Sequence, residues 1–373
     1  MRARGCAGPN ITARPKRHTY SRAQAEARAA GLFVPHLPER FGGLALGIMG
    51  MCVLFREMGR SPVGARVFNC DAPDQGNMDL LLRSGTAAQQ ARYLDPLARA
   101  EITSTFCMTE PAPGAGADPS NLRTAARRDG DGWVIDGHKW YSTGGEAASF
   151  LIVMARTSPD NDKSAATMFL VDRHAPGVEF VRNVATFAEE ILAHREAELR
   201  FHGVRVGDDA VLGQVGEGFH LAQVRLVPAR LTHCMRWLGL ARRCMELAQA
   251  YVEERSAFGI RLAERESVQM KLGRLAMAIE IGRLLVFKAA WKLDQGERAR
   301  TEISLAKVHV ADTLHLAADT AIQLQGARGY SRDTVAEWIY RYARQARLVD
   351  GASEVHEMVI AKAWRERGAE IWA

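Results

Sequence analysis

The spacing of apolar residues changes twice along the chain of 373 residues, and the two changes divide it into three regions. In the first region, residues 1–105, apolar side chains recur at helical spacing. They predict helices over residues 23–30 and 48–58, and shorter ones over 79–83 and 87–97. Because proline and glycine clusters separate these stretches, we expect a helical domain with many turns.

The second region, residues 106–213, has the shorter period that is typical of β-strands. Two strands joined by a tight Asp-Gly turn are predicted within residues 124–137. Further strands are predicted over 150–155, 166–171 and 197–206. The regular spacing of the turns favours a small β-barrel or sandwich.

The third region, residues 214–373, returns to helical spacing. Its long amphipathic stretches are 219–256, 266–294, 300–325 and 334–347. Each is longer than the mean globular helix of about 11 residues, and four such lengths favour an antiparallel four-helix bundle. The chain is therefore predicted to be an α+β multidomain protein with an N-terminal helical domain, a central β-barrel or sandwich, and a C-terminal bundle.

Composition and charge narrow the class of protein. Hydrophobic residues make up 47% and charged residues 25%, as in a soluble globular protein. We expect no membrane span, since no apolar run approaches the roughly 18 residues that a bilayer requires. The net charge of +6 is scattered, without the interleaved basic and aromatic residues of a nucleic-acid groove, so no nucleic-acid partner is expected.

The cysteines and the N-terminus suggest a reducing compartment. Six cysteines show no CxxC or Cys/His ligand spacing, so we predict neither a structural metal nor disulfides. The N-terminus is basic but has no apolar segment of the kind a secretory signal contains. We therefore expect a cytoplasmic protein.

Five segments resemble the signature segments of the acyl-CoA dehydrogenase family and occur in the family's order. They are residues 106–118, 137–145, 255–259, 323–330 and 350–356. One such match would be weak evidence, but five in order on the matching domain pattern are strong. The resemblance implies the acyl-CoA dehydrogenase fold and a flavoenzyme that uses FAD.

Three further segments are similar to one branch of that family. Residues 59–62, 68–78 and 230–236 resemble the branch that includes the eleventh-type human enzymes. Members of that branch can carry a kinase-like domain, and no such portion occurs in these 373 residues.

The resemblance also implies which residues contact the flavin. Thr109, Tyr141 and Thr143 match positions that face the isoalloxazine ring, although each alone would be an ordinary β-sheet residue. The full set of implied FAD contacts is Phe106, Met108, Thr109, Gly116, Ala117, Tyr141, Ser142, Thr143, Arg255, Phe258, Gln323, Gly326 and Ala352.

Part of this set is implied to act across a subunit interface. Arg255 and Phe258, with Gln323 and Gly326, resemble residues that hold the pyrophosphate and adenine of a neighbouring subunit's FAD. An exposed arginine on a helix is otherwise usually only solvated. If the resemblance holds, the protein is a homodimer or homotetramer.

Asp350 matches the family's catalytic base, which is more commonly glutamate. A carboxylate before glycine near a helix start is otherwise more often a cap or turn residue. Burial beside the flavin is expected to raise the pKa of Asp350, and its backbone N–H is expected to polarise the thioester oxygen. Arg230 is expected to organise the site, and Ala229 removes the alternative base position that some relatives use.

The implied reaction leaves three hypotheses open. The first is α,β-dehydrogenation of an acyl-CoA, with electrons passing to an electron-transfer flavoprotein or similar acceptor. The second keeps the fold but is an oxidase or monooxygenase that uses O₂. The third is a non-catalytic homologue without flavin, which the departures Glu266, Ala327 and Ala352 from the usual pattern motivate.

Overall fold

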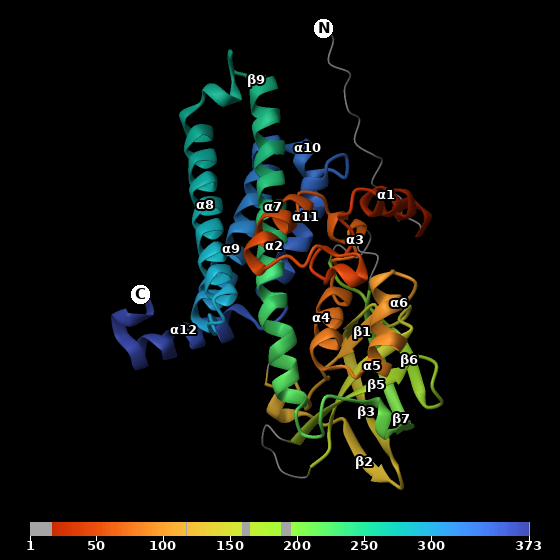
Figure 1. The fold of residues 1–373 in the computed structure, drawn as a ribbon. Helices are drawn as coiled ribbons and strands as arrows, with labels where there is room; N and C mark the ends of the chain where they lie inside the picture. Colours follow the sequence, from red (N-terminus) through yellow and green to blue (C-terminus); the bar gives the residue numbers. More distant parts are fainter. Residues whose placement is uncertain (1–16, 117, 159–164, 188–194, 373) are drawn as a thin grey trace.

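The computed structural model describes residues 17–116, 118–158, 165–187 and 195–372, and it has helices, then a sheet, then helices (Figure 1). The N-terminal helices are α1 (Arg17–Ala29), α2 (Ile48–Met58), α3 (Gly64–Val67), α4 (Asp74–Ser84), α5 (Ala87–Gln89) and α6 (Asp95–Ala98), with a π-helical turn over Gln90–Leu94 joining the last two. The prediction for 48–58 is confirmed. The helix predicted over 79–83 begins earlier, at Asp74, because the polar residues of its first turns are buried and gave no apolar period.

The central strands are β1 (Ser104–Cys107), β2 (Ala125–Asp129), β3 (Gly132–Thr143), β4 (Phe150–Arg156), β5 (Ala166–Asp172), β6 (Val178–Val184), β7 (Glu196–Gly207) and β8 (Val211–Leu212). They form one eight-stranded sheet in the order β6-β7-β3-β2-β4-β5-β8, with β1 parallel to β4. The Asp-Gly turn joins β2 to β3 as predicted. No strand was predicted at β1, β6 or β8. Strand β6 lacks a clean alternation of buried and exposed residues, and β1 and β8 are short, at 4 and 2 residues.

Both faces of β4 are buried, and they face different cores. Phe150, Ile152 and Met154 pack in a core shared with the N-terminal helices. Leu151 and Val153 face a second core whose buried members all come from the strands and their connections. Such a core indicates a sheet that folds around its own interior, in the manner of the predicted barrel or sandwich.

The C-terminal helices are α7 (Gly218–Glu254), α8 (Glu266–Asp294), α9 (Arg300–Gln325), α10 (Ala327–Tyr330), α11 (Val335–Ala343) and α12 (Ser353–Arg367), and the short hairpin β9 (Ser256–Ala257) with β10 (Ile260–Arg261) links α7 to α8. The predictions for α8 and α9 are confirmed to the residue. The stretch predicted over 334–347 is α11 followed by a 3₁₀ turn. In Figure 1, α7, α8 and α9 lie side by side, whereas α12 projects from one end of the group.

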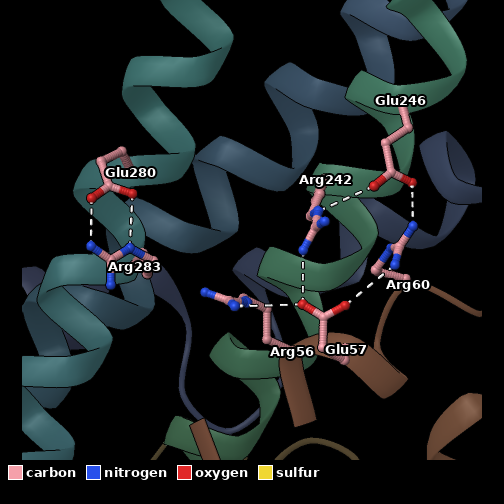
Figure 2. Close-up of polar contacts among 7 residues, drawn as sticks. All are labelled: Arg56, Glu57, Arg60, Arg242, Glu246, Glu280 and Arg283. Carbon is pink, nitrogen blue, oxygen red and sulfur yellow. Dashed lines mark hydrogen bonds and ion pairs between the residues drawn. The ribbon is translucent and has the colours of Figure 1, made fainter. Parts of the chain in front are cut away.

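Helix α2 packs directly on α7 and joins the N-terminal helices to the bundle. A Cβ on Gly239 would lie 2.2 Å from the Arg56 carbonyl oxygen, so only glycine allows this backbone approach. At the rim, Glu57 of α2 bonds to Arg242 of α7, and Arg60 bonds to Glu246 (Figure 2). These partly exposed ion pairs add little free energy, so the close glycine contact and the apolar core fix the two helices together.

Two features are absent from the residues that the structure describes. No helix in this part of the chain is both long enough and apolar enough to cross a bilayer. Within the same residues, no cluster of His, Cys, Asp and Glu could hold a metal ion.

Candidate active site

A buried ion pair joins the two flavin-like motifs of the sheet. Lys139 of β3 donates to the Glu110 carboxylate (2.8 Å) and to the Met108 carbonyl (3.0 Å). The Lys139 and Glu110 side chains are 0% and 2% exposed, so this pair belongs to the protein interior and not to a ligand. Glu110 also accepts backbone N–H bonds from Ala115 and Thr124, among others. Burial favours the neutral acid, but Lys139 and these donors hold the pKa of Glu110 below its usual range.

A β-bulge presents Tyr141 at the surface of this motif. The pairing of β3 with β7 slips between Lys139 and Ser142, and Tyr141 takes φ 49° with 45% of its area exposed. The neighbouring Trp140 N–H donates to the Thr109 carbonyl (3.1 Å), which sets the two loops side by side. A bulge of this kind re-aims a side chain, and a non-glycine residue at positive φ is common at functional sites.

The other residues that are implied to lie beside the flavin ring (the ring-side residues) differ in how exposed they are. Thr109, Met108 and Phe106 are half-buried, and Thr143 is half-buried with its hydroxyl donating to Glu196 (2.9 Å). Gly116 is exposed and has open space where a side chain would lie. The remaining two are Ser142, which is fully buried and therefore presents no atom to a ligand at this surface, and Ala117, which lies outside the described residues.

Asp350 lies in a tight turn that is anchored from three helices. Its backbone is left-handed, with φ 54°. Arg230 of α7 donates to the Asp350 carbonyl (2.8 Å), and Lys307 of α9 donates to the Gly351 carbonyl (2.7 Å). His356 of α12 lies 3.4 Å from the same Asp350 carbonyl. Arg230 thus holds this turn through the main chain, and among the described residues the Asp350 amide N–H has no protein acceptor.

The expected rise in the pKa of Asp350 is wrong for the structure as it stands. Burial is the largest single influence and favours the protonated acid, but His233, Arg225, Arg230 and Lys307 together lower the pKa of Asp350. The carboxylate is 20% exposed, and its Oδ2 lies 3.3 Å from His233 Nε2. The sequence prediction considered burial alone and missed cations that come from distant parts of the chain.

Arg225 connects Asp350 to the flavin-like motifs. Its guanidinium lies 4.1 Å over the Phe106 ring of β1, and its charge contributes to the low pKa of Asp350. The Arg225 Nε donates to Asn77 of α4 (2.8 Å). The N-terminal helices, the sheet and α7 therefore meet at one place, with the carboxylate beside it.

The remaining predicted contacts lie far from this place. Arg255 and Phe258 end α7 at the β9–β10 hairpin, at the opposite end of the bundle from the sheet (Figure 1), and Phe258 is 97% exposed. Arg255 lies about 38 Å along α7 from Arg230, at about 1.5 Å per residue. A single subunit therefore does not bring the ring-side residues and Arg255 into one site.

Gln323 and Gly326 lie near that same distal end. Both are exposed at the end of α9. The next helix, α10, places the Arg328 guanidinium 5.9 Å from the Tyr251 ring near the end of α7. The two implied adenine-side motifs are thus neighbours in the fold although they are far apart in sequence.

The three departures from the family pattern occupy helix starts. Ala352 precedes α12 as its N-cap and makes no side-chain cap bond, unlike a hydroxyl residue. Glu266 begins α8, Ala327 begins α10, and both are exposed. None of the three disturbs the surroundings of Asp350.

Sequence reasoning missed three residues that shape the site. Glu110 and Lys307 are buried charges, and His233 contacts the proposed base. Glu110 lies within the first motif and Lys139 within the second. Opposite charges in two segments that are both implied to contact the flavin could have indicated this ion pair. No local pattern singles out Lys307 or His233, because their partners lie more than 40 residues away.

This architecture, in which α7, α9 and α12 hold the backbone of the Asp350 turn, is that of a defined family. The models of the N-terminal, middle and C-terminal domains of acyl-CoA dehydrogenase match residues 7–101, 105–204 and 216–364. The chain belongs to the acyl-CoA dehydrogenase family.

Individual relatives agree with this assignment. FadE2 of Mycobacterium tuberculosis, described as an acyl-CoA dehydrogenase, is 40% identical over 316 residues, which are 83% of this chain and 77% of that protein. Human acyl-CoA dehydrogenase family member 11 is 36% identical over 90% of this chain and 43% of its own length. A Mycobacterium abscessus structure described as an acyl-CoA dehydrogenase superposes with TM-score 0.88 at 35% identity, covering 93% of this chain and 86% of that one. The chain thus spans less than half the length of several curated relatives, the human protein among them.

Proposed function

We propose that this protein is an FAD-dependent acyl-CoA dehydrogenase that removes the α and β hydrogens of an acyl-CoA thioester, with Asp350 as the α-proton base. The proposal rests on the position of Asp350. Arg230 anchors its turn, and the charge of Arg225 acts on its carboxylate. The guanidinium of Arg225 lies over the ring of Phe106, on the strand that leads into the flavin-like motif.

The described residues fit a flavin at the sheet. The bulge exposes Tyr141 next to Thr109, and Gly116 leaves open space where a side chain would block an approaching ligand. Met108 and Thr143 would complete the ring side. FAD, when bound, supplies the oxidant that accepts two electrons from the substrate.

The protein's own contribution is to position and to take a proton. An ionised Asp350 accepts the α proton on a carboxylate oxygen, and its free amide N–H is placed to donate to the thioester oxygen. A substrate that covers the carboxylate removes its remaining contact with water, which raises the pKa of Asp350 from its low resting value. Arg230 and Lys307 donate to carbonyls of this turn, so they hold its position.

The distance between the ring side and Arg255 supports a homodimer or homotetramer. We propose that Arg255, Phe258, Gln323 and Gly326 of one subunit complete the FAD site of another, because none can reach the sheet of its own chain. The reduced flavin would pass its electrons to an electron-transfer flavoprotein or a similar acceptor. We further propose that the protein acts in the cytoplasm.

Flavin bleaching under anaerobic conditions tests the proposal. The purified, FAD-loaded protein is mixed with a panel of acyl-CoAs, and the loss of flavin absorbance is followed by stopped flow. Asp350→Asn is expected to retain FAD but to bleach at least about 100-fold more slowly, since general base catalysis contributes about 100- to 10,000-fold. Asp312→Asn is the matched control, because Asp312 is exposed on α9, where its carboxylate pairs with Arg347.

The possible outcomes of this experiment distinguish the three hypotheses. Bleaching of Asp350→Asn at the wild-type rate refutes the base assignment. A chain that takes up no FAD supports the flavin-less homologue. Rapid reoxidation of the reduced flavin on admission of air supports an oxidase or monooxygenase.

A further inference from the structure

Arg225 of α7 is a buried cation that forms no ion pair with any described residue. It is 7% exposed, and no carboxylate of the described chain lies within ion-pair distance of its guanidinium. Arg242 of the same helix, by contrast, is partly exposed and pairs with Glu57 and Glu246. A buried charge without a partner is costly, so the isolation of Arg225 requires an explanation.

Side chains from two other elements hold the guanidinium in one place. Arg225 Nε donates to Asn77 Oδ1 of α4 (2.8 Å), and Asn77 Nδ2 donates to the Ser104 hydroxyl of β1 (2.9 Å). Ser104 in turn donates its hydroxyl and its backbone N–H to Asp74. The guanidinium carbon lies 4.1 Å from the centroid of the Phe106 ring. Because Asn77, Ser104 and Asp74 are all buried, this position is fixed before any ligand binds.

The two terminal nitrogens of Arg225 are free to bind a ligand. Among the described residues, neither Nη1 nor Nη2 has an acceptor. Neither belongs to the unbonded atoms that are sealed from solvent, of which Arg56 Nε is an example. They therefore keep an opening to the outside. Such a pair of nitrogens forms a planar fork that matches the two oxygens of a carboxylate.

The charges around Arg225 leave room for a further anion. Burial lowers the pKa of Arg225, and the charge of Asp350 is the largest one that opposes this effect. Asp79 also contributes, but its Oδ2 accepts from Gln75 (2.6 Å). In the proposed reaction Asp350 becomes neutral when it accepts the α proton. Arg225 would then lose its main counter-charge, unless the substrate itself carries an anion.

We infer that Arg225 is a specificity-determining residue that binds a carboxylate on the acyl chain, so that the preferred substrates are ω-carboxyacyl-CoA thioesters. The inference rests on the proposed function, which brings the acyl chain to Asp350. Arg225 and Arg230 are five residues apart on α7, about 7.5 Å along its axis, and Arg230 donates to the Asp350 carbonyl. A short acyl chain spans a distance of this order.

Flavin bleaching with matched substrates tests the preference. FAD-loaded protein is mixed anaerobically with acyl-CoAs of equal chain length that end in a carboxylate, a hydroxyl or a methyl group. For the wild type, the second-order rate constant is expected to be about 10- to 100-fold higher with the carboxylate, as hydrogen bonds to a charged group provide. Arg225→Met removes the charge and is expected to abolish the preference. Arg225→Lys is expected to keep part of it, because lysine retains the charge but not the fork.

Arg243→Met is the matched control. Arg243 is a partly exposed arginine of the same helix and lies 3.8 Å from Glu246, so this variant is expected to keep the wild-type preference. Equal rates with the carboxylate and methyl chains in the wild type would overturn the inference. A preference that survives in Arg225→Met would also overturn it, as would equal use of the hydroxyl chain, since a charge would then not be recognised.

Equilibrium binding gives a readout that does not depend on turnover. Isothermal titration calorimetry measures the affinity for the corresponding 2-enoyl-CoAs, which are the products of the proposed reaction. The wild type is expected to bind the carboxylated product about tenfold or more tightly than the methyl-ended one. Arg225→Met is expected to lose this difference, because the carboxylate would be buried without a partner.

Circular dichroism and flavin content verify that each variant is folded and loaded with FAD. Preferential binding of the carboxylated product by the wild type without any bleaching counts against the proposed function alone. Bleaching without any preference between the chains, in rate or in affinity, counts against the role of Arg225 alone.

Discussion

Removal of Lys139 should expose how much the buried ion pair contributes to stability. Lys139→Met keeps the length and the apolar stem of the side chain but deletes the charge that faces Glu110. Both side chains are almost completely buried, so water does not replace the lost partner. Breaking a buried pair from one side costs about 3–5 kcal/mol. Because three backbone N–H groups still donate to Glu110, we expect the lower end of that range, about 3 kcal/mol.

Urea unfolding measures this loss of unfolding free energy. Far-UV circular dichroism and tryptophan fluorescence monitor the transition, and coincident curves from the two probes indicate two-state unfolding. The control is Lys271→Met on the exposed face of α8, for which we expect a change within about 0.5 kcal/mol. The low pKa of Glu110 also determines how the difference in stability changes with pH. The low pKa of Glu110 stabilises the fold above the usual carboxyl range and is lost as pH falls, so the difference between wild type and Lys139→Met should shrink in acid. Equal stability of the two proteins at neutral pH, or a difference that grows in acid, would refute this reasoning.

Two further variants test the fold and the subunit interface. Gly239→Ala should lower the free energy of unfolding by about 1–3 kcal/mol through overpacking, whereas Gly273→Ala, whose new Cβ meets nothing within 4 Å in the middle of α8, should raise it by about 0.5–1 kcal/mol; equal effects would contradict the close approach of α2 and α7. Arg255→Ala should weaken FAD retention by about tenfold or more, the expected loss of a charge-assisted bond, while Arg274→Ala on the exposed face of α8 should not. Fluorescence titration of the apoprotein with FAD measures both, and unchanged affinity in Arg255→Ala would count against a site completed across subunits.

The sequence was most informative where an apolar period ran unbroken. The bounds of α2, α8 and α9 were predicted correctly, since each carries a continuous helical pattern. Helix α12 was missed because three of its large apolar residues, Val355, Met358 and Trp364, are exposed and form no buried stripe. The spacing of apolar residues predicts a helix through the face that it buries. It gives no signal for a helix whose apolar residues remain exposed at the surface.

The site was predicted as a set of positions but not as an electrostatic environment. Thr109, Tyr141 and Asp350 lie on a loop, a bulge and a turn, and their roles at a flavin site stay predictions. The direction of the pKa shift at Asp350 was wrong because Arg225, Arg230, His233 and Lys307 reach the carboxylate only through the tertiary fold. Charges that converge from separate helices have no local signature.

At Asp350, whose backbone is left-handed, the residue that the proposed activity requires differs from the residue that would be most stable there. Aspartate and asparagine tolerate positive φ better than most residues, but glycine tolerates it best. A glycine at this position would relax the turn and remove a buried charge, and it would also remove the proposed base. Directed evolution for thermal stability alone would therefore favour loss of this proposed catalytic group, so a screen for more stable variants should also select for turnover at every round.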